Sequence, residues 1–209
     1  MRKLGLTFAA ALAATIAAAP ASAATVTVGS VNSTVNNAGT VQDFSGFAAN
    51  SFLAPNVQVL DASVANVGKR PSGSTGNYLA VLGGGEYTYT LPTFAPVLSF
   101  IAGSIDTYNS VTLSILNLST NTTITQLFTG SQFGNTNGST DVRLTFDTGS
   151  SSQVITSALF KSTTNSFEID NIVSAAPEPA TWAMMILGFG FAGMGLRSSR
   201  RSRGKLALA

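Results

Sequence analysis

Hydrophobic and polar residues alternate in several short segments in the middle of the chain. The segments at 85–91 (GEYTYTL), 111–117 (VTLSILN) and 141–147 (DVRLTFD) place apolar residues at every second position. A period of two puts the apolar side chains on one face of a β-strand and the polar ones on the other. Further short apolar runs are TVTVGSV, YLAVL, VLSFIAG, TITQLF, QVITSALF and SFEIDNIV. Together they predict about eight to ten short strands and no amphipathic helix of useful length.

Turn-forming residues separate these predicted strands. They are Gly83 to Gly85, Asn121, Asn135 to Gly138, and Thr148 to Ser150. Asn137 and Gly138 both tolerate positive φ, so they predict a tight hairpin between a strand ending near Phe133 and one starting at Asp141. The less regular segment 31–56 is expected to wrap one end of the sheets. We therefore expect an all-β fold with a single β-sandwich or jelly-roll body.

The N-terminal segment 1–23 has the organisation of a signal peptide. Arg2 and Lys3 precede an alanine-rich apolar run from about Leu4 to Ala19, and Ala21 and Ala23 supply the small residues of a cleavage site. We expect signal peptidase to cut after Ala23. The alternative, an N-terminal anchor helix, is disfavoured because the run is short of about 20 strongly apolar residues.

The body at 24–175 is long enough for one domain with its own core. The chain has no cysteine and no histidine. These absences exclude a Ser-His-Asp triad, a cysteine nucleophile and a histidine-type zinc site in this chain. The abundance of Thr, Ser, Asn, Gly and Val favours strands and turns.

The basic residues of the chain are concentrated at its two ends. The chain as a whole carries a formal charge of +2, yet the body holds four basic against eight acidic residues. A basic surface for phosphate backbones is therefore absent, and we expect no nucleic-acid partner.

The C-terminal segment 176–203 combines a short motif, an apolar run and a basic cluster. The uncharged run at 180–196 has 17 residues, near the shortest helix that can cross a bilayer. Pro177 and Pro179 are expected to keep Glu178 extended and exposed. The arginines after the run, Arg197, Arg200, Arg201 and Arg203, are expected to stay in the cytoplasm. A transmembrane helix with the body outside the inner membrane is predicted.

This tail resembles the PEP-CTERM sorting domain of exported Gram-negative proteins, in its PEPxxWA variant. The matching residues are Pro177, Glu178, Pro179, Trp182, Ala183, Met184, Met185, Gly188, Gly190, Gly193 and the following arginines. The resemblance implies recognition by an exosortase, cleavage near the Pro-Glu-Pro motif, and release to the cell surface or extracellular matrix. It also implies an association with exopolysaccharide or biofilm. The same tail is also known as an ice-binding protein C-terminal domain. An ordinary C-terminal anchor would explain the span and the arginines, but not the motif.

Two segments of the body, 103–113 (GSIDTYNSVTL) and 166–179 (SFEIDNIVSAAPEP), resemble segments of exosortase-dependent surface proteins with jelly-roll bodies. That resemblance implies the same kind of body, and no defined chemistry.

Several residues of the body are candidates for chemistry. Calcium, the one candidate cofactor, would take oxygen ligands from Asp106, Asn109, Glu168, Asp170 and Asn171, although no spacing matches a calcium loop. Asp106 and Asn109 alternatively form an Asx turn before the strand at Val111. Glu168 and Asp170, with Asp106 and Asp147 nearby, are the alternative catalytic carboxylates of a glycan-active enzyme.

Two further alternatives concern binding surfaces. Tyr78, Tyr87, Tyr89 and Tyr108 are candidates for a sugar-stacking surface, or else pack in the core. The threonine pairs Thr88 with Thr90 and Thr123 with Thr125 are candidates for an ice-binding face. The main prediction is an exported, non-enzymatic surface or matrix protein processed by an exosortase. A carboxylate-dependent secreted enzyme and an ice- or carbohydrate-binding module are the alternatives.

Overall fold

The computed structural model describes residues 23–35, 38–134 and 141–175. Most of the predicted signal peptide, including Ala21, the Asn137–Gly138 turn and the entire sorting segment at 176–203 lie outside these residues. Within the described ranges no helix is long and apolar enough to cross a membrane.

Twelve strands and one short 3-10 helix make up the described part of the chain. They are β1 (Thr25–Gly29), β2 (Ala38–Gln42), β3 (Phe52–Ala54), β4 (Val57–Leu60), β5 (Tyr78–Val81), β6 (Glu86–Ala95), β7 (Val97–Gly103), β8 (Asn109–Asn117), β9 (Thr122–Thr129), η1 (Gly130–Phe133), β10 (Val142–Asp147), β11 (Gln153–Ser162) and β12 (Phe167–Ala175).

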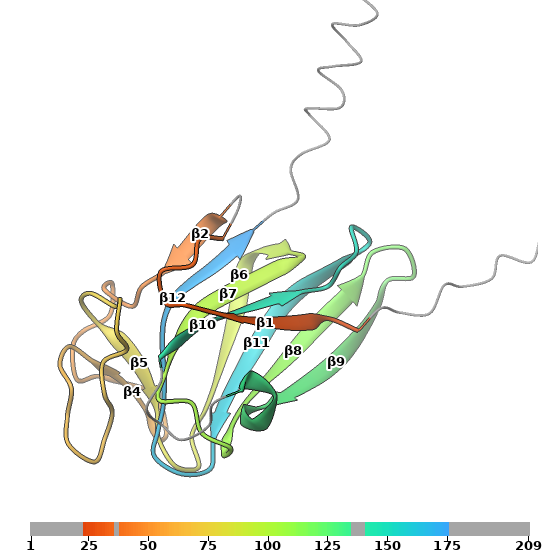
Figure 1. The fold of residues 1–209 in the computed structure, drawn as a ribbon. Helices are drawn as coiled ribbons and strands as arrows, with labels where there is room; N and C mark the ends of the chain where they lie inside the picture. Colours follow the sequence, from red (N-terminus) through yellow and green to blue (C-terminus); the bar gives the residue numbers. More distant parts are fainter. Residues whose placement is uncertain (1–22, 36–37, 135–140, 176–209) are drawn as a thin grey trace, which may run out of the picture.

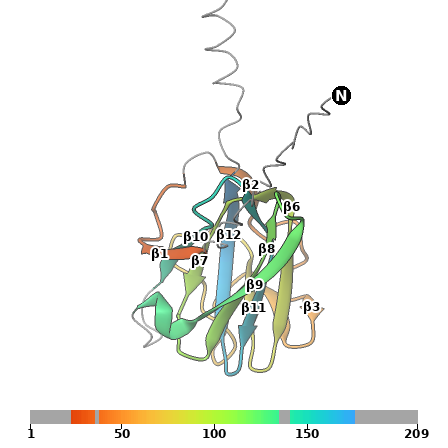
Figure 2. The same ribbon diagram turned by 90° about the vertical axis from the view of Figure 1, so that its right-hand side faces the viewer.

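The strands form two antiparallel sheets that face each other (Figures 1 and 2). The larger sheet has the order β1-β10-β7-β12-β5-β4-β3, and β2 also pairs with β12. The smaller sheet has the order β6-β11-β8-β9. The predicted all-β sandwich is therefore confirmed, with more strands than the sequence indicated.

The core between the sheets is rich in phenylalanine. The ring of Phe100 lies 5.0 Å from that of Phe160 on the opposite sheet, edge to face. Phe146 and Phe128 make a similar pair at 4.9 Å. Each fully buried phenylalanine contributes about 1.5–3 kcal/mol of hydrophobic stabilisation, so these inter-sheet pairs hold the two layers together.

The predicted alternation is confirmed in the strands that have one solvent face. Tyr89 and Leu91 of β6 are buried, while Thr88 and Thr90, which alternate with them, are exposed. In β8 the apolar positions likewise form part of the core, and the residues between them face outward. In β10 the apolar positions also belong to the core side, but Arg143 on the opposite face is buried as well.

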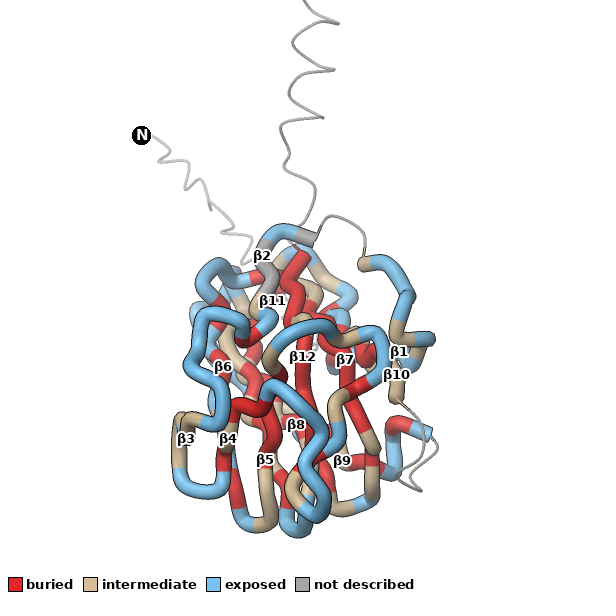
Figure 3. Tube along the Cα trace, turned by 90° about the vertical axis from the view of Figure 1, so that its left-hand side faces the viewer, coloured by how far each residue is buried: buried red, intermediate tan, exposed pale blue. Residues whose placement is uncertain are grey.

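The outer face of the larger sheet is partly covered by the β4–β5 connection at 61–77. Leu60, Tyr78 and Ala80 form a second, smaller apolar cluster there, against Val67 and Leu82. All four residues of β5 are buried as a result. Figure 3 shows the buried strands β5 and β12 behind exposed loops.

The predicted hairpin between a strand ending near Phe133 and a strand at Asp141 is wrong. Phe133 belongs to η1, and the flanking strands β9 and β10 lie in different sheets. The connection therefore crosses from one layer to the other instead of joining neighbouring strands.

Candidate functional site

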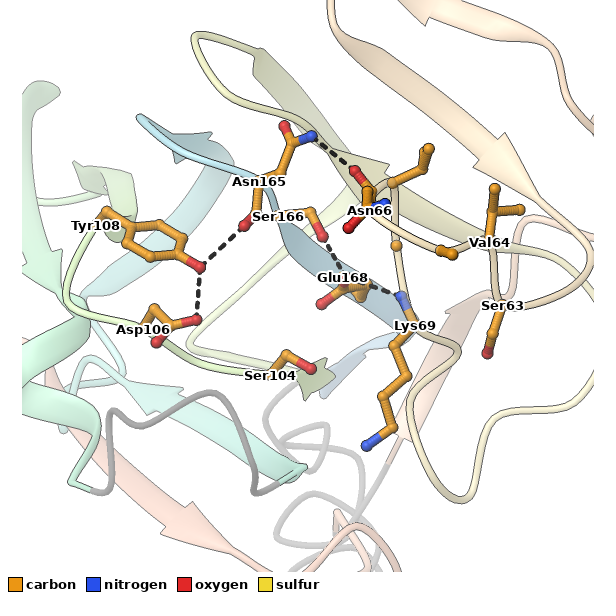
Figure 4. Close-up of a pocket in the computed structure, with 13 residues that line it drawn as sticks. Ser63, Val64, Asn66, Lys69, Ser104, Asp106, Tyr108, Asn165, Ser166 and Glu168 are labelled. Carbon is orange, nitrogen blue, oxygen red and sulfur yellow. Dashed lines mark hydrogen bonds between the residues drawn. The ribbon is translucent and has the colours of Figure 1, made fainter.

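Three loops enclose an open cleft of about 550 Å³ at one end of the sandwich (Figure 4). They are the β4–β5 connection, the β7–β8 connection, and the turn that leads into β12. The lining residues are Ser63, Val64, Ala65, Asn66, Val67, Gly68, Lys69, Ser104, Asp106, Tyr108, Asn165, Ser166 and Glu168. Its volume lies in the range of small-molecule sites, about 300–1,000 Å³.

The β4–β5 wall is a tight turn fixed by its own backbone. The amide of Val64 donates to the carbonyl of Gly68 at 2.8 Å, and the amide of Gly68 returns a bond to the carbonyl of Val64 at 3.1 Å. The buried hydroxyl of Tyr78 donates to the carbonyl of Gly68 at 3.0 Å. A Cβ at Gly68 would lie 3.2 Å from side-chain carbons of Ala80 and Leu60, so a larger residue would have to displace them slightly. This wall of the cleft is therefore held against the outer face of the larger sheet.

Asp141 ties two walls of the cleft together. Its carboxylate accepts the amide of Ser72 at 2.8 Å and the amide of Ser104 at 3.1 Å. Burial opposes ionisation of this carboxyl, but the hydrogen bonds from Ser72 and Ser104 outweigh it and lower the pKa of Asp141.

Tyr108 stands on the side of the cleft opposite Lys69 and Ser63 (Figure 4). Its hydroxyl lies 2.6 Å from Asp106 Oδ2 and 2.9 Å from the carbonyl of Asn165. A phenol has one proton, and the shorter contact goes to the carboxylate of Asp106. Burial, followed by the bond to Asp106, raises the pKa of Tyr108, so Tyr108 presents a neutral ring.

Glu168 lies between these two sides. Its Oε1 accepts the amide of Lys69 at 3.1 Å and the hydroxyl of Ser166. Among the residues that the structure describes, its buried Oε2 has no hydrogen-bond partner. Burial raises the pKa of Glu168 because the charged form loses hydration there. An unpartnered buried oxygen at the edge of a polar cleft is a ready contact for a ligand hydroxyl.

The predicted calcium ligands are only partly brought together. Asp106 and Glu168 line the cleft, but Asn109 is buried in the predicted turn, where its Oδ1 accepts the amide of Asp106 at 2.7 Å. Asp170 lies beneath the β4–β5 connection and accepts the hydroxyl of Ser74, and Asn171 follows it on β12 with φ +48°. Among the residues with described positions, no group of three or more acidic side chains could hold a metal ion. Calcium stays a prediction.

The predicted catalytic pair is divided between two environments. Phe167 and Ile169 of β12 point into the core, so Glu168 and Asp170 share the outer face, as the sequence indicated. Glu168 lines the cleft, whereas Asp170 is not among the lining residues. Asp147 caps the far end of β10, where it accepts the amide of Gly149 at 2.8 Å.

The predicted tyrosine surface does not form as one patch. The hydroxyl of Tyr78 is held by backbone carbonyls, and Tyr89 belongs to the core. Tyr87 packs edge-on against Phe44. Tyr108 is the one tyrosine among the lining residues of the cleft.

Sequence reasoning missed Asn66, Lys69, Ser104, Asn165 and Ser166. They come from three separate loops, and the one signal in the sequence was the density of polar residues between predicted strands. Together with the carboxyl groups and the ring of Tyr108, these residues line the cleft with hydroxyl, amide and ammonium groups.

Two solved structures resemble the sandwich at low similarity. One is TmCBM61 in complex with β-1,4-galactotriose, 11% identical, with 61% of this chain and 86% of that chain covered and a TM-score of 0.34. The other is CsCBM6-3 from Clostridium stercorarium in complex with cellobiose, 14% identical, with 66% and 94% covered and a TM-score of 0.32. Similarity at this level says nothing about a ligand.

No curated protein matches the chain. The tail does match a known family, described as the PEP-CTERM protein-sorting motif, over residues 175–201. The resemblance carried by Pro177, Glu178, Pro179 and Trp182 is thereby confirmed. The motif implies exosortase-dependent export toward the cell surface. The chain is a protein with a PEP-CTERM sorting domain.

Proposed function

We propose that the β-sandwich is a non-enzymatic surface or matrix protein that binds a glycan in its end cleft. In this proposal signal peptidase removes residues 1–23, and the sorting segment holds the chain in the inner membrane for a time. An exosortase then cleaves near Pro177–Glu178–Pro179 and releases the body among exopolysaccharide. The sorting match over residues 175–201 supports the export step.

The observation that carries the glycan assignment is the chemistry of the cleft. Hydroxyl, amide and carboxyl groups from three loops line the cleft together with Tyr108, whose side chain stands on one side of it (Figure 4). Sugars combine many hydroxyls with an apolar ring face, so they need such donors and acceptors beside an aromatic surface. The unpartnered Oε2 of Glu168 supplies an acceptor, or a donor when protonated, that a sugar hydroxyl would satisfy.

The same carboxyls support binding better than hydrolysis. Asp106 is already engaged by the hydroxyl of Tyr108, and Asp170 is bonded to Ser74 outside the cleft. A glycosidase needs two free carboxyls on either side of the scissile bond. We therefore place Asp106 and Glu168 in a binding role.

Calorimetric titration of the full chain with the host's own exopolysaccharide tests the proposal. Tyr108→Ala should weaken binding about 2- to 10-fold, from the loss of about 0.5–1.5 kcal/mol of ring contact. Tyr108→Phe keeps the ring and should bind nearly as the parent does. Thr90→Ala, on the outer face of the smaller sheet, is the matched control.

Two outcomes would contradict the proposal. Equal binding by the parent and Tyr108→Ala would show that the glycan does not bind against Tyr108 in the cleft. Release of sugars by the parent, abolished in Glu168→Gln, would show an enzyme instead.

Ice binding is a second candidate, supported by the register of the smaller sheet. Thr90, Ser157, Ser114 and Thr125 stand opposite one another across its four strands. This row of hydroxyls is not visible along the sequence. Ice binding predicts thermal hysteresis in solutions of the full chain that is reduced in Thr125→Leu, and normal freezing behaviour would exclude it.

A further inference from the structure

The free edge of β9 is the feature of this sandwich that is least protected against pairing with another strand. All eight residues of β9, Thr122 to Thr129, pair in register with β8 on one side. On the other side no strand of the described chain pairs with β9. An edge strand presents a row of backbone donors and acceptors that can pair with another strand.

The other edges are short or carry residues that block pairing. The opposite edge of the same sheet, β6, contains Glu86 and Pro92, and a proline has no amide to donate. The end strands of the larger sheet, β1 and β3, have five and three residues, and β2, which within the described chain pairs only with β12, has five. β9 contains neither a charged residue nor a proline. It therefore lacks the devices that proteins commonly use to block an edge.

Exposed apolar side chains gather on the β8–β9 hairpin. Leu118, Ile124 and Leu127 expose 55%, 36% and 57% of their surfaces. An apolar side chain next to unpaired backbone adds a hydrophobic contribution to strand pairing.

The strand is also held rigid from the core side. The side chain of Gln126 accepts the amide of Ala24 and donates to the carbonyl of Ala24, both at 2.8 Å. A strand fixed on one side and along its length loses little conformational entropy when a partner pairs with it.

We propose that β9 pairs antiparallel with β9 of a second copy of this chain, about a two-fold axis. An antiparallel edge is complementary to itself under such an axis. Self-pairing brings like charges face to face in a charged strand, but β9 has no charged side chain, so no like-charged side chains of this strand oppose each other in the pair. The two four-stranded sheets then form one continuous sheet across the dimer.

The pairing also fixes the direction of the two clefts, a consequence that rests on the proposed function. Gly130, directly after β9, lies so close to the β7–β8 connection that a Cβ would be 1.9 Å from the carbonyl oxygen of Asp106. The cleft therefore lies beyond the C-terminal end of β9. Antiparallel pairing puts these ends at opposite sides of the dimer, where each cleft can hold a separate polymer chain.

Sedimentation equilibrium of the full chain, in density-matched detergent and without any glycan, tests the pairing. Thr125→Lys places a charge near the centre of the edge and should halve the apparent mass from dimer to monomer. Thr90→Lys makes the same substitution in the same cross-strand row, on the edge formed by β6. It should remain dimeric, and any association through the tail is common to both variants.

Cross-linking gives a second measurement that does not depend on how Thr125→Lys folds. The chain has no cysteine, so Thr125→Cys introduces its one thiol near the predicted axis. Oxidation should link Thr125→Cys into a covalent dimer and leave Thr90→Cys without a covalent link. A parent that is monomeric at every concentration, a dimeric Thr125→Lys, or equal cross-linking of both cysteine variants would each overturn the proposal. Because no glycan is present, these results are independent of the cleft's function.

Discussion

Asp170 is a buried carboxyl group whose ionisation opposes folding. Its side chain lies on the outer face of β12, beneath the β4–β5 connection, and is 0% exposed. Oδ2 accepts a hydrogen bond from the hydroxyl of Ser74, while Oδ1 has no hydrogen-bond partner within the described part of the chain. Burial raises the pKa of Asp170 from 3.8 to about 6, because a charge in this position is poorly solvated.

The raised pKa of Asp170 makes the stability of the fold depend on pH. The folded state holds the proton of this carboxyl more tightly than the unfolded state, so the protonated carboxyl contributes its full stabilisation below pH 3.8. It is lost as the pH rises through about 6. At 1.36 kcal/mol for each tenfold change in proton affinity, the loss is about 3 kcal/mol.

Asp170→Asn replaces the carboxyl with a neutral group of the same shape and removes this loss. Near pH 4 the variant and the parent should unfold at similar denaturant concentrations. Near pH 8 the variant should be more stable than the parent by about 3 kcal/mol. Urea unfolding of both proteins across this range gives the difference directly.

Asp43→Asn is the matched control. Hydrogen bonds from Ser45 lower the pKa of Asp43, so its removal should have the opposite sign and a smaller effect. If the unfolding free energies of the parent and Asp170→Asn changed in parallel with pH, this prediction would be wrong. Such a result would mean that the carboxylate is as well solvated in the fold as in the unfolded chain.

Three further predictions concern the ends of the chain and the end of β9. Gly130→Ala would force the carbonyl of Asp106 away and should destabilise the fold by about 1–3 kcal/mol and weaken glycan binding by calorimetry. Gly46→Ala, where a Cβ meets nothing within 4 Å, should change neither quantity. Gln126→Ala removes both bonds to Ala24 and should lower stability by about 1–3 kcal/mol in thermal unfolding; an unchanged midpoint would contradict this. Replacing Pro177 and Pro179 with alanine should leave the full-length chain in the membrane fraction on immunoblots, whereas normal release would show that the motif is not needed for cleavage.

The strands with one solvent face could be predicted from the sequence, because their alternation reports burial directly. This is true of β6 and β8, and of the core face of β10. It is less true of β12, because the β4–β5 connection covers its outer face. Glu168 and Asp170 on that face are as buried as Phe167, which points into the core between the sheets. The sequence could not show that cover, since it depends on a loop nearly 100 residues away.

Local sequence patterns could not show which strand joins which sheet. Asn137–Gly138 predicts a hairpin turn, yet β9 and β10 belong to different sheets. A turn dipeptide indicates a change of direction in the chain, and it carries no information about which sheet the next strand joins.

The cleft was partly foreseen. The sequence predicts Asp106 and Glu168 as candidate calcium ligands or catalytic carboxyls, because carboxylate oxygens suit both roles, and both line the cleft. Lys69 and Asn165 could not be selected, because ordinary polar residues in separate loops become a site only when the fold brings them together.

The proposed function depends on the binding of a matrix glycan in the end cleft. This binding can be located residue by residue by NMR. The isotope-labelled protein, recovered after processing, is titrated with the host's exopolysaccharide. If the cleft binds the glycan, the amide shifts concentrate at 63–69, 104–108 and 165–168. Shifts confined to the outer face of β6, β11, β8 and β9, or no shifts at all, would contradict it.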